Sequence, residues 1–189
     1  MVYSKLQIQY WRNYNMTVLK VINTNYDTFT SIQNLYNYVM NPAKLEHSIF
    51  NSNLLYTQLG GYGIAKQFCD IANFYGKTGS LARHYIISYD DITCDFPLWE
   101  IIHTFETSIT NLYEYPFFYA LHENTDNLHF HFVLCSTNLY TGKKYLDTKD
   151  NHELFRSNLH AFTAFRTLNP YQKNKKAYFI PGCTLVYSN

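Results

Sequence analysis

Three histidines that fall within ten residues of one another are the clearest candidates for chemistry in this chain: His122, His129 and His131. The run 128–135 is rich in aromatic and branched residues and predicts a β-strand. Because side chains alternate between the two faces of a strand, His129 and His131 would share a face, with Cα atoms about 7 Å apart. The run 115–121 is also strand-like, and a hairpin between the two strands would place His122 nearly opposite His129, within ~5 Å. The three imidazoles would then converge on one position.

Such a convergence predicts a metal site. A single histidine on a strand is more often a hydrogen-bonded core or surface residue, but three at hairpin spacing favour metal binding. Neutral imidazole suits Zn, Mn, Ni, Co or Fe better than Mg, which prefers oxygen ligands. Three protein ligands leave a coordination position open, which is typical of catalytic rather than structural sites.

A tyrosine is the second residue of interest, on a predicted helix over 29–39 whose apolar residues form one stripe. Tyr36 lies on that stripe and is expected in the core. Tyr38 lies more than about 100° away from it by the helical period. With 19 tyrosines in the chain, position alone leaves Tyr38 either functional or merely exposed.

The elements that must position these residues follow from the periodicity of the whole chain. The patterns predict an α+β fold with a central, mainly antiparallel sheet of about five strands flanked by helices. We expect the helices to pack on the face opposite the histidines. The segment 45–59 is expected to be a loop or a DNA-facing flap, and 60–63 a turn. The predicted strands are 17–22, 83–89, 115–121, 128–135 and possibly 178–187, and the predicted helices are 29–39, 64–74, 97–112 and 150–168.

Length and composition indicate one domain over 16–189, after an N-terminal leader over 1–15. The leader lacks the features of a signal peptide and no segment could span a membrane, so a cytoplasmic protein is expected. Four scattered cysteines suggest reduced thiols rather than a disulfide framework. A net charge of +1 does not indicate a nucleic-acid binder. The 19 tyrosines and 14 phenylalanines could stack on unpaired bases, or could reflect an AT-rich genome.

The string 120–131 closely resembles the third motif of MobP-type plasmid relaxases, which belong to the HUH endonuclease superfamily. In that motif two histidines flank one hydrophobic residue and a third lies seven positions upstream, as here. Three weaker likenesses accompany it: 37–44 is similar to the nucleophile motif, 83–88 to the middle strand, and 140–145 to the turn after the histidines. Together they cover most of 16–150.

The resemblance implies a relaxase, a strand-specific DNA transesterase that nicks single-stranded DNA at an origin of transfer (oriT) and starts conjugation or mobilisation. Tyr38 would attack the phosphodiester, leaving a 5′-phosphotyrosine and a free 3′-hydroxyl. His122, His129 and His131 would hold a divalent metal ion such as Mn, Mg or Zn. The implied partners are single-stranded DNA at oriT, accessory transfer proteins and a coupling protein, with no membrane.

The resemblance also suggests supporting residues, each with an ordinary alternative. Glu123 and Asp126 are candidate second-shell or acid/base groups, or solvated loop charges; family members often have an acid where Asn124 stands. His84 would face the site from the neighbouring strand, or be a packed core histidine. Four basic residues could hold phosphates, or could be isolated surface charges: Lys44, Arg83, Lys143 and Lys144.

Two other functions remain open on the sequence. One is a non-catalytic DNA-binding module with a structural Tyr38. The other is a rolling-circle replication initiator, although relatives of that kind carry their tyrosine after the histidines and not before them. The chain is short for a relaxase, so a catalytic fragment or a protein dependent on accessory factors is expected.

Overall fold

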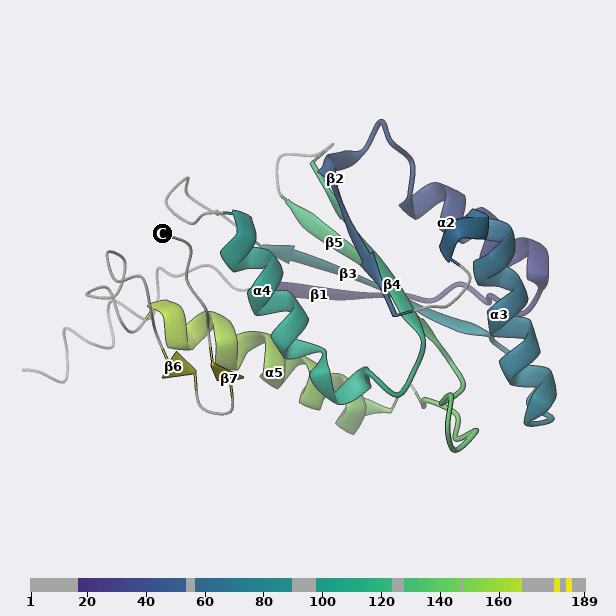
Figure 1. Cartoon of the computed structure of the whole chain (residues 1–189). Helices are drawn as coiled ribbons and strands as arrows, with labels where there is room; N and C mark the ends of the chain where they lie inside the picture. Colours follow the sequence, from purple (N-terminus) through teal and green to yellow (C-terminus); the bar gives the residue numbers. More distant parts are fainter. Residues whose placement is uncertain are drawn as a thin grey trace, which may run out of the picture.

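The structure is a computed structural model that describes residues 17–53, 57–89, 98–123, 128–146, 148–167, 179–180 and 183–184 (Figure 1). The expected leader over 1–15 and Asp126 lie outside the described residues. The strands are β1 (Thr17–Ile22), β2 (Leu45–Ser52), β3 (Ala82–Tyr89), β4 (Phe117–His122), β5 (His129–Cys135), β6 (Phe179–Ile180) and β7 (Cys183–Thr184). The α-helices are α2 (Phe29–Val39), α3 (Gly60–Phe74), α4 (Leu98–Ser108) and α5 (Lys149–Thr167), with 3₁₀ turns η1 (Thr57–Leu59) and η2 (Thr110–Leu112). Among these residues no helix is both long and apolar enough to cross a membrane.

The central sheet has five strands in the order β1-β3-β5-β4-β2, and every neighbouring pair is antiparallel. The α+β prediction is therefore confirmed. β4 and β5 form the expected hairpin, with His122 opposite His129 and Ala120 opposite His131. On the other side of β5, Ile86 of β3 pairs with His131. The histidine strand is thus the middle strand of the sheet.

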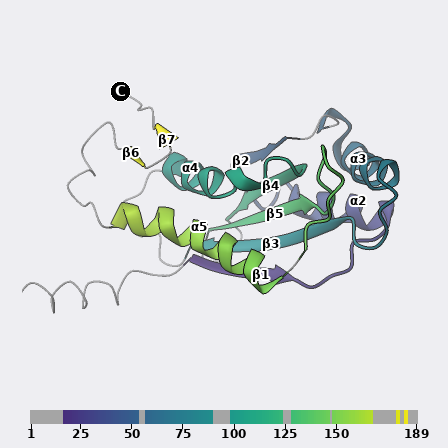
Figure 2. The same cartoon turned by 90° about the horizontal axis from the view of Figure 1, so that it is seen from below.

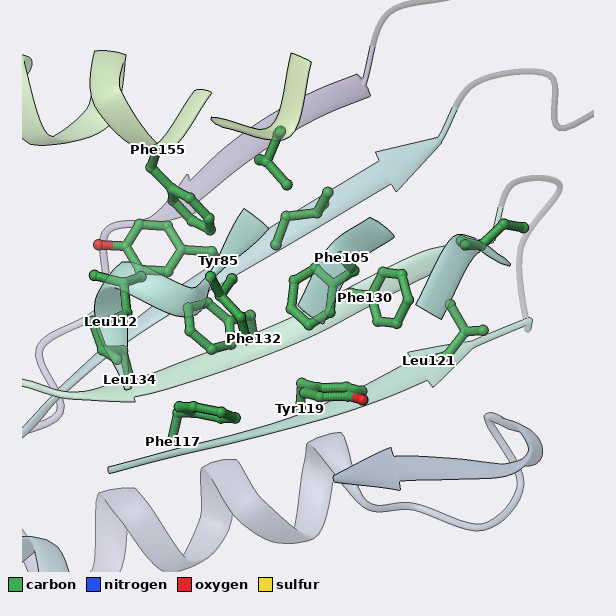
Figure 3. Packing of buried hydrophobic residues seen from close by; sticks show 14 of the residues in the cluster. Tyr85, Phe105, Leu112, Phe117, Tyr119, Leu121, Phe130, Phe132, Leu134 and Phe155 are labelled. Carbon is green, nitrogen blue, oxygen red and sulfur yellow. The ribbon is translucent and has the colours of Figure 1, made fainter. Parts of the chain in front are cut away.

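One face of the sheet is covered by α4 and α5, and its core is mainly aromatic (Figure 3). Phe105 of α4 stacks on Phe130 of β5 with ring centroids 4.2 Å apart. Phe155 of α5 meets Tyr85 of β3 edge to face at 5.5 Å. Burying one such side chain contributes roughly 1.5–3 kcal/mol. This face therefore fixes the strands whose other face carries the histidines.

The histidine face is also covered by helices, so the expectation that helices pack on the opposite face alone is wrong. Ile32, Leu35 and Val39 of α2 pack with α3 against Phe118 and Val133 of the sheet. The physical reason is that apolar residues share this face with the histidines and need their own cover. In Figures 1 and 2, α2 and α3 lie side by side, away from α4 and α5.

The segment 45–59 was expected to be a loop or flap, and this is wrong for its first half, which forms the edge strand β2. β2 pairs with β4, with Leu45 opposite His122 and a register shift before Phe50. Asn53 extends the pairing, since its Oδ1 accepts from the Phe117 backbone N–H at 2.6 Å. An edge strand is paired along one side only and commonly carries polar residues, so its sequence lacks the continuous apolar run of an inner strand buried on both faces.

The glycines at 60–63 were expected to form a turn, but α3 begins at Gly60, four residues earlier than predicted. Gly60 has φ +55°, which glycine adopts without strain. Gly61 lies against α2: a Cβ there would stand 3.0 Å from Asn37 Oδ1 and 3.1 Å from Tyr36 Cδ1. The glycines therefore let α3 approach the end of α2 that carries Tyr38.

Candidate active site

The three histidines of the β4–β5 hairpin converge as their spacing predicted. All three are buried, and one potential ligand nitrogen from each lies within 4.8 Å of the others. The ring centroids of His122 and His131 are 4.3 Å apart, and those of His129 and His131 are 5.1 Å apart. Among the described residues this is a group that could hold a metal ion.

His122 is oriented by the end of α2. Its Nε2–H donates to the backbone carbonyl of Val39 at 2.7 Å. A neutral imidazole carries one proton, so this contact leaves Nδ1 with a lone pair that can bind a metal. The last residue of the helix is therefore a supporting group for a residue 83 positions later in the chain.

His131 is oriented from the opposite side, by β3. His84 Nε2 lies 2.8 Å from His131 Nδ1, and the hydroxyl of Tyr26 lies 3.1 Å from His84 Nδ1. With Nδ1 engaged, His131 has Nε2 left for a metal. The structure thus places His84 against a histidine of the cluster, and both rings are buried.

Burial favours the neutral forms of His84, His122 and His131, and metal ligation requires a neutral imidazole. Burial, together with the neighbouring His122, His84, His129 and Lys44, lowers the pKa of His131 to about 2. Burial, with His122 nearby, lowers the pKa of His84 to about 4. Burial also lowers the pKa of His122, against the opposing effect of its bond to Val39. Neutral imidazoles with directed lone pairs fit a divalent ion of the Zn or Mn kind.

Tyr38 lies beside this cluster near the C-terminal end of α2. Its ring centroid is 5.4 Å from that of His131 and 6.4 Å from that of His122. Tyr38 is 47% exposed, whereas Tyr36 is half-buried and packs on Phe118 with centroids 5.3 Å apart. The helical period therefore separates the two tyrosines as the apolar stripe predicted.

Lys44, in the turn after α2, also lies beside Tyr38 and the histidine cluster. Its backbone N–H donates to the carbonyl of Asn41 at 2.9 Å, and its own carbonyl accepts from Glu123 N–H at 3.1 Å. Its Nζ stands 4.0 Å from the centre of the Tyr38 ring. The structure thus brings a cation, an accessible phenol and three imidazoles together.

The three other predicted DNA-binding residues, Arg83, Lys143 and Lys144, are not brought to this cluster. Arg83 pairs with Leu134 and so shares its face, which is opposite the histidines. Lys144 bridges to Thr137, six residues beyond His131, roughly 20 Å along the strand direction. Its Nζ donates to the Ser80 carbonyl at 2.7 Å, and the adjacent Lys143 is exposed. Glu123 follows His122 and is exposed.

Sequence reasoning missed two supporting groups, the Val39 carbonyl and the Tyr26 hydroxyl. Tyr26 is 58 residues from His84 in sequence, and a backbone carbonyl has no residue-type signature. Neither contact leaves a local pattern. Only the packing of α2 and the position of the segment after β1 could reveal them.

Comparison with known proteins places the chain by family. The family model described as "Relaxase: MobA/VirD2-like, nuclease domain" matches residues 38–164, about two-thirds of the chain. The match begins at Tyr38 and includes all three histidines of the cluster. No curated protein matches the chain.

Proposed function

Because this chain belongs to the relaxase family with a MobA/VirD2-like nuclease domain, we propose that it nicks single-stranded DNA site-specifically at an origin of transfer and so starts conjugative transfer or mobilisation. The nick would proceed through a 5′-phosphotyrosine on Tyr38. The observation that carries the proposal is the accessible Tyr38 ring 5.4 Å from His131 at the edge of a three-histidine cluster. The expected partners are single-stranded DNA at oriT, accessory transfer proteins and a coupling protein.

In the proposed reaction the Tyr38 oxygen forms a bond to phosphorus while the bond from phosphorus to the 3′ oxygen breaks. The phenol loses its proton, and the departing 3′ oxygen gains one. A divalent ion held by His122, His129 and His131 would polarise the scissile phosphate and stabilise its developing charge. The roles of the protein are to present the phenol and to hold the phosphate within roughly 3–3.5 Å of it.

Lys44 is proposed to bind the scissile phosphate or its neighbour. Its ammonium stands over the Tyr38 ring, so a phosphate placed for attack by the phenol would lie close to it. A cation near a phosphate strengthens binding and stabilises charge in the transition state. The backbone bonds of Lys44 to Asn41 and Glu123 hold the turn that carries it.

The remaining predicted residues are proposed to act at longer range. His84 would be the acceptor that orients His131, in the position expected of a second-shell group. Glu123 and Asp126, in the connection after His122, would take or give protons at the edge of the site. Arg83, on the other face of the sheet, and Lys143 and Lys144, further along it, would contact flanking DNA rather than the scissile phosphate.

Replacing Tyr38 tests the nucleophile directly. Tyr38→Phe removes one oxygen and no packing, so the variant should fold and bind DNA normally yet form no covalent adduct. The substrate is a labelled single-stranded oligonucleotide from the protein's own oriT, incubated with Mn²⁺ and resolved on a denaturing gel. Tyr36→Phe is the matched control, since Tyr36 packs on the sheet, and it should retain cleavage.

Each alternative result has a distinct meaning. If Tyr38→Phe still becomes attached to the oligonucleotide, another tyrosine is the nucleophile, and Tyr26 and Tyr56 would be replaced next. If the unaltered protein binds DNA and neither cleaves it nor forms an adduct, the chain is a non-catalytic binding module on the same fold.

A further inference from the structure

A buried chain of hydrogen bonds leads from His131 away from the other two histidines. His131 Nδ1 contacts His84 Nε2 at 2.8 Å, and His84 Nδ1 contacts the Tyr26 hydroxyl at 3.1 Å. Tyr26, His84 and His131 are 9%, 4% and 1% exposed, respectively. The chain joins the segment after β1 to β3 and then to β5. It uses both ring nitrogens of His84, so the protonation pattern of one residue constrains the others.

Two proton arrangements satisfy both contacts when all three groups are neutral. In the first, His131 Nδ1–H donates to His84 Nε2, and His84 Nδ1–H donates to the Tyr26 oxygen. In the second, the Tyr26 O–H donates to His84 Nδ1, and His84 Nε2–H donates to His131 Nδ1. The first leaves His131 Nε2 with a lone pair, whereas the second leaves a proton there.

We propose that Tyr26 is a positioning residue that acts through His84 to hold His131 in the tautomer whose Nε2 can bind a metal. The inference rests on the proposed function, in which His131 is a metal ligand. A carboxylate in this place would fix the tautomer by itself, because it can only accept a hydrogen bond. His84 is a neutral ring that can donate or accept, so it needs a further group that accepts from its other nitrogen. Tyr26 is placed to be that acceptor.

The energetic consequence of removing the Tyr26 oxygen follows from burial. In the metal-binding arrangement His84 Nδ1–H would lose its acceptor, although His84 is only 4% exposed. An unpaired buried N–H is among the least tolerated defects in proteins. The chain would then favour the second arrangement, in which His84 Nδ1 carries no proton and His131 Nε2 does. Metal binding must reverse that preference, and the affinity falls.

The first experiment measures Zn²⁺ affinity by calorimetry in Tyr26→Phe and in the matched control Tyr36→Phe. Both changes remove one phenol oxygen next to the same packed cluster of α2, α3 and the sheet. We expect Tyr26→Phe to weaken Zn²⁺ binding by ~10-fold, the lower end for supporting groups of metal ligands, and Tyr36→Phe to leave it unchanged. Equal Zn²⁺ affinity in the two variants would overturn the inference. A purely structural role for Tyr26 would lower the unfolding temperature and leave the affinity unchanged.

The second experiment asks whether Tyr26 acts through His84. In a His84→Leu background His131 Nδ1 has no ring beside it to accept its proton, so adding Tyr26→Phe should change the Zn²⁺ affinity no further. A ~10-fold loss in both backgrounds would mean that Tyr26 acts by another route.

The third measurement needs no variant and so remains informative if Tyr26→Phe does not fold. Nitrogen-detected NMR spectra of the unaltered protein with Zn²⁺ report which ring nitrogen of each histidine carries the proton. We expect the proton of His84 on Nδ1 and that of His131 on Nδ1. A His84 proton on Nε2 in the Zn²⁺-loaded protein contradicts the inference alone. Failure of the unaltered protein to bind Zn²⁺ would instead remove the metal from the proposed function, and this inference with it.

Discussion

His122 and His131 each enter the histidine cluster with one ring nitrogen already hydrogen-bonded to the protein. Val39 O engages Nε2 of His122, and His84 engages Nδ1 of His131. The two rings therefore present different nitrogens, Nδ1 and Nε2, and a metal would be held by a mixed set. Such supporting contacts fix ring orientation before an ion arrives, and this reduces the entropy lost on binding.

Replacing one of the three proposed metal ligands should weaken metal binding by more than the loss of one metal–nitrogen bond. His131→Ala removes a nitrogen and also leaves His84 Nε2 facing a cavity, so we expect Mn²⁺ or Zn²⁺ affinity to fall by ~10-fold or more. The measurement is isothermal titration calorimetry of the purified protein. The control is His103→Ala on α4, a helix that covers the opposite face of the sheet. Unchanged metal binding in His131→Ala would count decisively against the site.

The buried neutral histidines should make the metal-free protein acid-sensitive. Below pH 6.5 an unfolded chain takes up protons at His84 and His131, whereas the folded chain, with pKa values of about 4 and about 2, does not. The unfolded state then binds more protons, so the unfolding free energy falls as the pH falls, by up to ~1.4 kcal/mol per pH unit for each histidine. Urea unfolding at pH 7.5, 6.5 and 5.5 would reveal the slope, which His84→Gln should reduce. Constant stability over this range would refute the explanation.

At the scale of the elements, the site is made where the C-terminal end of α2 meets the β4–β5 hairpin. Thr28 caps the start of α2 in a capping box with Ser31, and Gly61 of α3 lets the two helices approach. Tyr38 and the Val39 carbonyl then stand one residue apart, the first beside the cluster and the second bonded to His122. One helix end thus supplies both the proposed nucleophile and a support for a proposed metal ligand.

The turn that carries Lys143 packs against Tyr75 at Gly142. Substitutions of Gly142 and Gly76 test how much this contact stabilises the fold. Gly142 has φ +66° and a Cβ there would stand 2.3 Å from Tyr75 Cδ1, whereas Gly76 has φ +59° and nothing within 4 Å. Gly76→Ala should cost roughly 1–2 kcal/mol of stability from backbone conformation alone. Gly142→Ala should cost clearly more, because it also displaces the Tyr75 ring, whose hydroxyl donates to the carbonyls of Leu139 and Tyr140. Thermal unfolding of the two variants gives the comparison, and equal losses would exclude a packing role for Gly142.

At the scale of the whole molecule, the features that could be predicted from sequence depend on residues only a few positions apart in the chain. Period-two alternation and a short connection were enough to predict the β4–β5 hairpin and the shared face of His129 and His131. The helical period was enough to separate Tyr38 from Tyr36. Both regularities act within a few residues, so the local sequence contains them.

The features that could not be predicted depend on contacts between distant segments. β2 is a strand because β4 offers it a hydrogen-bonding edge, and its own sequence gives no such pattern. The helices on the histidine face, the Tyr26 hydroxyl and the Val39 carbonyl became visible only with the packing of α2. The glycines at 60–63 indicate a turn by their sequence alone, because a close helix approach and a turn require the same residue.

Because β5 is the middle strand of the sheet, its histidines are held more rigidly than the Tyr38 side chain at the end of α2. Every residue of β5 is buried and the strand is bonded on both sides, by β3 and by β4. Separating it therefore requires the whole sheet to open, so its amide hydrogens should exchange only with global unfolding. Tyr38 lies in the last turn of α2 beside the buried Val39, but its own side chain is 47% exposed and can change its rotamer without any buried surface being opened. A DNA strand joined to Tyr38, as proposed, would therefore move with this side chain while His129 and His131 keep their places.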